Sequence, residues 1–543
     1  MSSVQRFYYC IFFFLFLTSN AYSQAFVSSN LPIVLLTTNG QVINDYVKIN
    51  ANMGIIWNGP GKRNALVDPE NNFNGNISIE IRGSSSQMFP KKSYGFETKS
   101  SDWVNLDVSL IDLPEENDWI LYAPYTDKTM IRDVLTYTLD ASLGHYTPRC
   151  RYVELFVNDE YQGVYVLMEK IKRNKNRVDI AKLLPTDISG ENLTGGYIIK
   201  IDKTTGGSGE GWHSDYINNT NKTYYQYHYP QSDEITTEQK KYIQSYVRNM
   251  EQSLYTERFS GQGSYHEYLN DSSFIDFMII NELSKNIDGY RLSSFLYKGK
   301  NKLMNCGPIW DFNLTYGNAD YLNAWLPTGF QYQATMEGDN WQNPFWWNRL
   351  MRDPAYVQKL KRRWSWIRKN QFSDQRIKFV TDSLVSLLSE AQVRNYQKWT
   401  GVIGSYVWPN YFIGSSYAAE VTWMKDWLTK RLAFLDKSWP YNFTGSENLQ
   451  ASASISIYPN PFTDRLEIQL APSLNGSALV ELFSTSGMLM LKIKADIQNG
   501  HVQLDFSENN SIPLGMYVIR VSQNNQVLLN EKIVKRPSGS RGF

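Results

Sequence analysis

The sequence is poor in cysteine, balanced in charge and without a long apolar run after its first 24 residues. Three cysteines occur among 543 residues, too few for a disulfide framework or a cysteine metal cage. Two of them, Cys150 and Cys306, follow the N-terminal segment, and the sequence leaves open whether they pair. Lys and Arg number 54 against 53 Asp and Glu, and no later stretch approaches the roughly 20 apolar residues that span a bilayer. We therefore expect neither a nucleic-acid partner nor a transmembrane segment.

Signature motifs of several enzyme classes are also missing. There is no H-E-x-x-H, and the five histidines are scattered, which disfavours a zinc hydrolase. Neither G-x-x-x-x-G-K-[ST] nor G-x-S-x-G occurs, which removes P-loop enzymes and α/β hydrolases from first consideration. A basic stretch at 359–369 is interleaved with two tryptophans at helical spacing. We interpret it as a solvated helix face and not as a nucleic-acid site.

The N-terminal segment predicts export from the cytoplasm. One arginine precedes an apolar run at 7–17, and small residues follow at positions 21 and 23. This is the pattern of a secretory signal peptide, and we expect residues 1–23 to be removed by cleavage after about Ser23. The apolar run is too short to span a bilayer.

The C-terminal region is a separate β module. Residues 441–452 are small and polar and are interpreted as a linker. From 453 onward, short alternating runs separated by turn residues predict a β-sandwich of about 80 residues. Its Y-P-N-P opening at 458–461, its S-T-S-G turn at 484–487 and its L-G-M-Y-V segment at 514–518 resemble the sorting domain of proteins exported by the type IX secretion system.

That resemblance covers residues 453–537. It implies the type IX export machinery as a partner, and a secreted or outer-membrane surface location reached through the periplasm. A generic adhesive β module is the alternative interpretation of this region.

The middle of the chain predicts an α+β fold. Hydrophobic residues make up 42 % and aromatic residues 14 % of the sequence, enough to bury a large core. Strand-like patterns occupy 31–98 and 151–171 and flank a helical pattern at 128–143. Further helices are predicted at 236–257, 272–285, 343–370 and 374–396. A β-rich first part and a helical second part within 24–440 predict two lobes with a ligand cleft between them.

Two aspartates stand at predicted element ends. The helix that begins near 272 ends near Lys285, and Asp288 follows in a loop. Two short strands at 294–298 and 303–310 then lead to Asp311. Phosphoryl transfer needs this pair of groups, because one carboxylate holds the metal that neutralises phosphate charge while another directs the proton of the nucleophile. Taken alone, the spacing favours structural capping.

A series of multi-residue words resembles the CotH family, named after spore coat protein H, over about residues 30–435. The words are R-G-S-S-S at 82–86, F-P-K-K-S-Y at 89–94, N-D-W-I-L at 117–121, M-I-R-D at 130–133, N-D-E-Y-Q-G-V-Y at 158–165, M-E-K-I at 168–171, N-E-L-S-K-N-I-D-G-Y-R at 281–291 and G-P-I-W-D-F at 307–312. CotH proteins are atypical kinases with a minimal kinase-like fold that transfer phosphate from ATP to serine. The resemblance implies ATP with Mg²⁺ or Mn²⁺ as cofactors, Asp288 as the catalytic residue and Asp311 as a metal ligand.

The chain departs from ordinary kinases at two positions. Five residues after the catalytic aspartate it has Ser293 where those kinases carry a metal-binding asparagine, and the third residue of its D-F-x word is Asn313. We favour Asn313 as the replacement metal ligand, and a single firmly held metal is the alternative.

Several residues are candidates for contact with the nucleotide. Backbone N–H groups of the serine-rich turn at 83–87, which contains Ser84 and Ser85, are suited to anion binding. Strand alternation predicts that Lys92 points inward toward the phosphates. Glu169 is expected to pair with this lysine or to lie at the hinge, and Arg132 to contact phosphate. A solvated surface position is the alternative for each of these three charged residues.

The sequence therefore predicts an exported kinase that phosphorylates serine hydroxyls of an acceptor protein. The main alternative is a catalytically silent surface module that binds glycans or proteins, because 78 aromatic residues suit platforms for sugar faces. A glycosidase with paired carboxylates is a third possibility.

Overall fold

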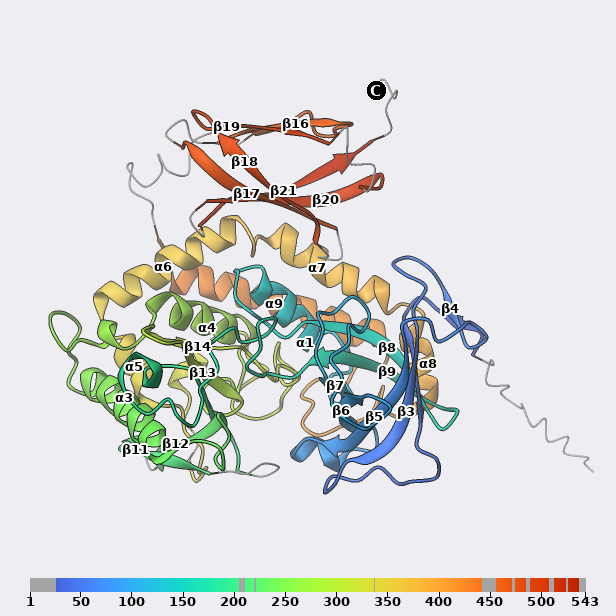
Figure 1. Cartoon of the computed structure of the whole chain (residues 1–543), viewed down its shortest axis with the longest axis horizontal. Coiled ribbons are helices and arrows are strands. Elements are labelled where there is room, and N and C mark those ends of the chain that lie inside the picture. The colour runs from blue at the N-terminus through green and yellow to red at the C-terminus, as the bar shows by residue number, and fades with distance from the viewer. Residues whose placement is uncertain are drawn as a thin grey trace, which may run out of the picture. The chain divides into compact units, whose positions relative to one another are not determined.

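The computed structural model describes residues 26–204, 210–218, 221–335, 337–441, 456–470, 474–484, 489–506, 512–523 and 526–536. The predicted signal peptide and nearly all of the predicted linker lie outside these residues. The chain forms two compact units, Met1–Pro440 and Tyr441–Phe543 (Figure 1). Both helices and strands occur, which confirms the α+β class, while the two-lobed kinase-like arrangement stays a prediction.

A closed seven-stranded barrel forms the first part of the larger unit. Its strands run in the order β2-β3-β5-β6-β7-β9-β8. Their bounds are β2 Ile33–Thr37, β3 Ile49–Ile56, β5 Phe73–Arg82, β6 Ser93–Lys99, β7 Asp118–Tyr122, β8 Cys150–Val157 and β9 Glu160–Glu169. The barrel closes because β2 pairs in parallel with β8, and β1 (Ser28–Ser29) pairs with β4 (Asn64–Ala65) outside it. Alternate side chains such as Ile77, Ile79 and Phe96 fill the interior without solvent exposure.

Helix α1 (Arg132–Ala141) connects β7 to β8 and starts later than predicted. The backbone of Met130 is left-handed, with φ 59°, so the helix cannot extend back through it. The Asp127 carboxylate instead accepts the N–H groups of Thr129 and Arg132, at 3.0 and 2.8 Å. The first turn of α1 is therefore fixed by a side chain that precedes it.

A five-stranded antiparallel sheet follows the barrel, in the order β11-β12-β10-β13-β14. Its strands are β10 Tyr197–Ile201, β11 Gly211–Asn218, β12 Asn221–Tyr229, β13 Ser294–Lys298 and β14 Met304–Cys306. The prediction for β13 is confirmed to the residue, whereas β10 to β12 were not predicted. In Figure 1 the barrel (blue to teal) and this green sheet with its helices occupy opposite sides of the unit.

The helices of the second part differ from prediction in number. They are α2 Gly190–Leu193, α3 Thr237–Tyr255, α4 Asp271–Ser284, α5 Phe345–Leu350, α6 Pro354–Lys369, α7 Asp374–Leu387, α8 Ala391–Lys398 and α9 Tyr417–Ser438, with short 3-10 turns η1 Ser85–Met88, η2 Tyr265–Glu267 and η3 Gln331–Gln333. The predicted helix 343–370 is two helices, because Asp353 caps a new one at Pro354. Likewise 374–396 divides into α7 and α8, and α9 was not predicted. No helix in the described ranges is long and apolar enough to cross a bilayer.

Helix α4 lies in the middle of the largest core. Phe274, Ile279 and Leu283 are fully buried, and tryptophans such as Trp347 pack around them. The basic stretch on α6 is ion-paired, with Arg363 bonded to Asp276 of α4 at 2.8 Å. This agrees with its interpretation as a helix face. Cys150 and Cys306 are both free thiols, so they do not pair with each other.

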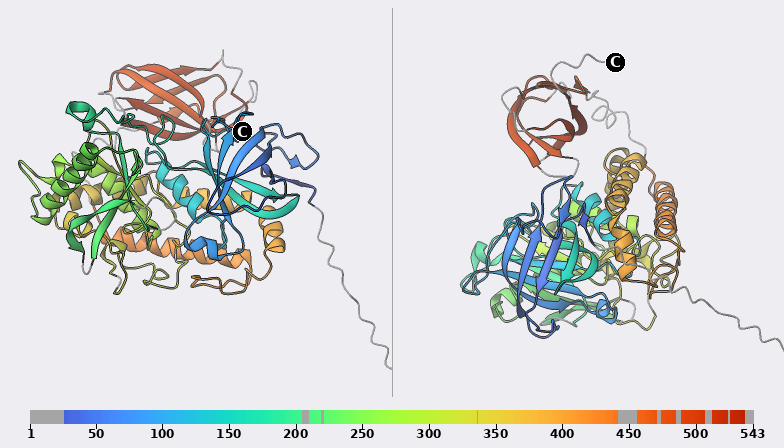
Figure 2. Two further views of the ribbon diagram at one scale, coloured as in Figure 1. Left: turned by 60° about the horizontal axis from the view of Figure 1, so that its bottom comes forward. Right: turned by 90° about the vertical axis from the view of Figure 1, so that its right-hand side faces the viewer.

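The smaller unit is the predicted β-sandwich (Figure 2). Strands β15 Ser456–Tyr458, β16 Arg465–Gln469 and β19 His501–Asp505 form one sheet, and β17 Gly476–Ser484, β18 Leu489–Ile497, β20 Gly515–Gln523 and β21 Gln526–Lys535 form the other. Apolar side chains of both sheets, including Leu466, Val480 and Ile519, are buried between them. The alternation in the sequence thus identified all seven strands.

Candidate active site

The loop after α4 positions Asp288. The helix ends at Lys285, whose backbone is left-handed with φ 48°. The Asp288 N–H donates to Asn286 Oδ1 at 3.2 Å, and Arg291 Nη2 donates to Asp288 Oδ1 at 2.6 Å. Arg291 also pairs with Asp339 at 2.9 Å. One carboxylate oxygen of Asp288 is therefore held by a fixed guanidinium, while 20 % of its side chain remains exposed.

The backbone around Asp311 is fixed from three sides. Its φ of 64° is left-handed, a conformation that is uncommon outside glycine and recurs at functional sites. The Asp311 N–H donates to Tyr137 Oη at 3.2 Å, and its carbonyl accepts from Asn286 Nδ2 at 3.2 Å. The next N–H, of Phe312, donates to Asp133 Oδ1 at 2.7 Å. These contacts leave the Asp311 carboxylate without a hydrogen-bond partner among the described residues.

Solvent reaches the Asp311 carboxylate although protein surrounds it closely. Its side chain is exposed to solvent, yet desolvation by surrounding protein raises its pKa to about 7, with further contributions from Asp288 and Asp202. Arg82 and Lys203 oppose this rise. Solvent access combined with dense surrounding protein is expected at the base of a recess. Asp202 follows β10, so four separate segments bring charged side chains to this point.

Arg82 is the main cation of the site. It ends β5, its guanidinium lies 5.7 Å from the ring centre of Trp310, and burial lowers its pKa while Asp311 acts in the opposite direction. A second carboxyl, Asp133, lies behind Asp311, and burial and the Asp311 charge raise its pKa to about 8. Sequence reasoning missed both residues as site members. The signals were present, because both occur inside family words, at 82–86 and 130–133.

The serine-rich turn begins directly after Arg82. Gly83 has φ 113°, and a Cβ there would lie 2.1 Å from Ser86 Oγ, so only glycine fits. Ser84 and Ser85 are exposed in this turn and begin η1. They follow Arg82 by two and three residues in the chain.

The prediction that Lys92 points inward was wrong. Lys92 is partly exposed and its Nζ donates to the Gln87 carbonyl at 2.5 Å. The buried residue is Lys91, whose Nζ donates to Val164 O at 2.6 Å and Asn395 Oδ1 at 2.8 Å. The strand begins only at Ser93, so its alternation does not extend back to either lysine. Through its bond to Gln87, Lys92 instead stabilises the turn that contains Ser84 and Ser85.

Glu169 and Arg132 have structural partners. Glu169 is fully buried and pairs with Arg149 at 2.8 Å, so neither the expected pairing with Lys92 nor a surface position is found. Arg132 is 1 % exposed; it pairs with Asp127, and its Nε donates to Thr315 O at 2.9 Å. Burial keeps Arg132 from touching phosphate in this structure. Its contact with Thr315 stabilises the segment that follows Asp311.

Asn313 is the second predicted metal ligand. It is partly exposed, and its Nδ2 lies 3.5 Å from Thr126 Oγ1. The amide nitrogen thus faces the protein, and the backbone carbonyl of Asn313 accepts from Asn318 Nδ2 at 2.7 Å. Within the described ranges, no three His, Cys, Asp or Glu side chains form a metal cluster. Mg²⁺ does not require one, because it usually keeps several waters and takes one or two carboxylates.

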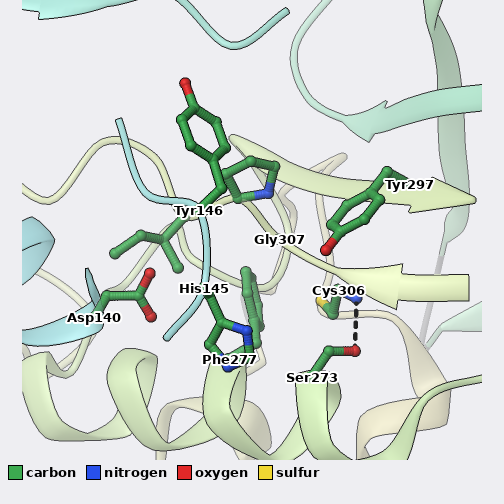
Figure 3. Close-up of a pocket in the computed structure, with 10 residues that line it drawn as sticks. Asp140, His145, Tyr146, Ser273, Phe277, Tyr297, Cys306 and Gly307 are labelled. Atoms are coloured by element: carbon green, nitrogen blue, oxygen red, sulfur yellow. Dashed lines mark hydrogen bonds between the residues drawn. The ribbon is translucent and has the colours of Figure 1, made fainter. Parts of the chain in front are cut away.

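A separate cavity lies beside the segment that leads into Asp311. Figure 3 shows His145, Tyr146 and Tyr297 around it, with the Cys306 N–H donating to Ser273 Oγ at 3.1 Å. His145 Nε2 bonds to Asp276 at 2.7 Å. The cavity does not include Asp288 or Asp311.

Comparison with known families identifies both units. Residues 79–435 match the family described as CotH kinase protein. The chain belongs to the CotH family. Residues 456–536 match the secretion system C-terminal sorting domain. This CotH-family protein is therefore directed to the cell surface or secreted.

Other comparisons add little to this assignment. No curated protein matches the chain. Among solved structures, it is similar to dimeric latent PorU from Porphyromonas gingivalis, with 15 % identity and a TM-score of 0.13. That similarity covers 16 % of this chain and 9 % of PorU, so it carries no argument about the site.

Proposed function

We propose that this CotH-family protein is a kinase that transfers the γ-phosphate of ATP to serine hydroxyls of an acceptor protein outside the cytoplasm. One observation carries the proposal: the exposed Asp311 carboxylate, close to Asp288 and Asp202, has its pKa raised to about 7. Desolvation is the largest cause of this rise, Asp288 and Asp202 add to it, and the charges of Arg82 and Lys203 do not offset it. A metal ion bound with a polyphosphate supplies further positive charge.

The residues of the recess fit a metal–nucleotide. Asp311 and Asn313 would hold Mg²⁺ or Mn²⁺, with Asp311 supplying an oxygen that no described side chain occupies. When bound, the ion neutralises phosphate charge and favours displacement at the γ-phosphorus. The Arg82 guanidinium and the N–H groups of Ser84 and Ser85 are suited to the phosphate oxygens. Lys92 supports them by holding the turn through Gln87.

Asp288 acts on the acceptor. Arg291 fixes one of its oxygens at 2.6 Å, which leaves the other to accept a hydrogen bond from the serine hydroxyl. As serine Oγ bonds to the γ-phosphorus, the bond from phosphorus to the ADP oxygen breaks and the hydroxyl proton passes to Asp288. A carboxylate oriented in this way contributes through positioning as well as proton transfer.

The test separates nucleotide binding from transfer. The full chain is incubated with Mg²⁺ or Mn²⁺ and γ-labelled ATP, with and without a serine-rich protein, and nucleotide-induced shifts in melting temperature are measured in parallel. Asp311→Asn should abolish both the melting shift and labelling. Asp288→Asn should keep the melting shift and reduce labelling at least about a hundredfold.

Glu257→Gln is the matched control, because Glu257 is a solvent-accessible carboxylate that pairs with Arg349 and Arg352 away from the site. It should behave like the wild type. If the wild type shows neither labelling nor a melting shift with either metal, the kinase proposal is wrong.

A further inference from the structure

Two loops beyond Asp311 form one rigid surface. The loop at 318–326 and the loop at 405–414 are joined by backbone bonds, from Tyr411 N to Asn318 O and from Asp320 N to Pro409 O, both 2.8 Å. Asn410 Nδ2 also donates to Asn318 Oδ1 at 2.9 Å. These bonds fix side chains from distant parts of the sequence in one place.

The joined loops present four exposed large side chains, Tyr406, Trp408, Tyr411 and Ile413, and two half-buried ones, Tyr321 and Trp325. Tyr321 stacks on Trp408 with ring planes 4° apart, and Trp325 stacks on Tyr411 with ring planes 5° apart. Trp408 and Tyr411 are each 44 % exposed. We call the following set the aromatic platform: Tyr321, Trp325, Tyr406, Trp408, Tyr411 and Ile413. Single exposed apolar residues are common, but here four of them lie on two loops that backbone bonds join, and two of the four stack on half-buried rings. Such a grouping is a candidate interaction site.

The aromatic platform is continuous with the candidate active site. Tyr321 is close enough to Asp288 and Asp311 for both carboxylates to raise its pKa, although burial is the larger cause. Lys285, three residues before Asp288, donates its Nζ to the carbonyls of Asn323 and Leu326 at 2.7 and 2.9 Å. The same short segments therefore position the carboxylates and the platform.

The chemistry of the platform indicates what it binds. Residues 314–335 and 399–416 contain a single charged residue, Asp320. Its carboxylate accepts a hydrogen bond from Tyr406 Oη at 2.7 Å. A strongly charged partner would therefore find no opposite charges on these segments. An apolar side chain, in contrast, gains from every square ångström it buries against the rings.

We propose that the aromatic platform binds the acceptor polypeptide and selects serines that are flanked by apolar or aromatic side chains. The proposal rests on the proposed kinase function, because it assigns an acceptor to that same site. Binding there holds the chain next to Asp288 and brings the serine hydroxyl into the recess. Selectivity then arises outside the residues that carry out transfer.

The experiment uses the full chain and three peptides of equal length with one serine, flanked by Leu and Phe, by Ala, or by Asp. Steady-state transfer gives KM and kcat, and calorimetry without nucleotide gives peptide affinity. The apolar peptide should have a KM roughly tenfold below that of the Ala peptide. Trp408→Ala and Tyr411→Ala should remove this preference by raising KM about tenfold, with kcat within about twofold of wild type.

Tyr255→Ala is the matched control, because Tyr255 is a 51 % exposed tyrosine on α3, outside the platform. It should keep the preference. Asp288→Asn should still bind the apolar peptide in calorimetry while losing transfer. If the wild type binds the apolar peptide selectively but transfers no phosphate to it, the kinase proposal fails and the platform proposal stands. The platform proposal is overturned if Trp408→Ala keeps the wild-type preference. It is also overturned if the platform variants lose binding of neutral oligosaccharides or self-association in sedimentation while peptide affinity is unchanged.

Discussion

Two carboxylates six residues apart in the same family word have opposite surroundings. Glu282, in α4, is fully buried, and Arg431 Nη2 donates to its Oε2 at 2.9 Å. The N–H groups of Gln331 and Tyr332 donate to it as well, at 2.9 and 2.8 Å. Asp288, just beyond the helix, is partly exposed and has one oxygen directed by Arg291.

The surroundings of Glu282 suit a structural role, and those of Asp288 suit ligand binding. Every strong donor near Glu282 is used to stabilise the fold, so no ligand can gain from its charge. Asp311 instead has the charges of Asp288 and Asp202 near it, Arg82 and Lys203 do not offset them, and solvent still reaches both Asp288 and Asp311. Charge that the protein leaves uncompensated is available to a ligand.

The largest expected effect comes from removing Arg431, the cation that pairs with buried Glu282. Arg431→Leu leaves Glu282 buried without its cation and should lower the free energy of unfolding by about 3–5 kcal/mol. Urea denaturation monitored by tryptophan fluorescence measures this change. Arg352→Leu, which removes an exposed arginine, should change it by less than about 1 kcal/mol. Equal losses in both variants would contradict the contrast drawn between buried and exposed pairs.

The next effect is the pH dependence of metal–nucleotide binding. Metal binding requires the ionised carboxylate, and the pKa of Asp311 is about 7. The affinity of the full chain for Mg²⁺–nucleotide should therefore be constant above about pH 8 and fall roughly tenfold per pH unit below 6. Calorimetry between pH 5.5 and about 8.5 tests this. An affinity independent of pH would show that Asp311 does not bind the metal.

A smaller effect concerns stability without metal. The pKa of Asp311 is raised in the folded state, so the fold binds an extra proton between about pH 4 and 7, and stability falls as pH rises through that window. Asp311→Asn removes this contribution. Metal-free Asp311→Asn should therefore melt slightly above wild type at pH 8 and at the same temperature at about pH 4. A lower melting temperature at pH 8 would mean that the carboxylate stabilises the fold.

The smallest effect concerns Asp339, which forms an ion pair with Arg291. Asp339→Asn keeps the shape of the side chain that accepts from Arg291 Nη1 at 2.9 Å but removes its charge. We expect a two- to fivefold loss of kcat with little change in the nucleotide-induced melting shift. Arg291→Lys should cost more, because a lysine cannot bridge two carboxylates with a rigid fork. The reverse order would indicate that Asp339 acts directly on substrate.

Local patterns in the sequence predicted the elements better than the site. Alternation identified the seven sandwich strands and β13, and the helix after 271 was predicted within one residue at each end. Boundaries failed where a side chain decides them, as at Asp353 before α6. The pairing of Asp288 with Asp311 was predicted from their places at element ends and from family words, and in the structure the charge of Asp288 contributes to the raised pKa of Asp311.

The remaining site residues depend on tertiary contacts. Whether Lys91 or Lys92 is buried depends on α8, which supplies Asn395 from more than 300 positions away. Glu169 pairs with Arg149, which precedes the neighbouring strand β8. The position of Asp202 depends on the pairing of β10 with β13. A periodic pattern contains no information about such partners.

The closing pair of the barrel has a consequence for how the protein folds. Ile33 of β2 pairs with Glu154 of β8. The first strand of the barrel therefore pairs with a segment about 120 positions later in the chain. Contacts of such long range slow folding, because the entropy of a large loop is lost before the contact forms. The barrel should therefore stay open until both β8 and β9 are available, because β9 joins β7 and β8 joins β2.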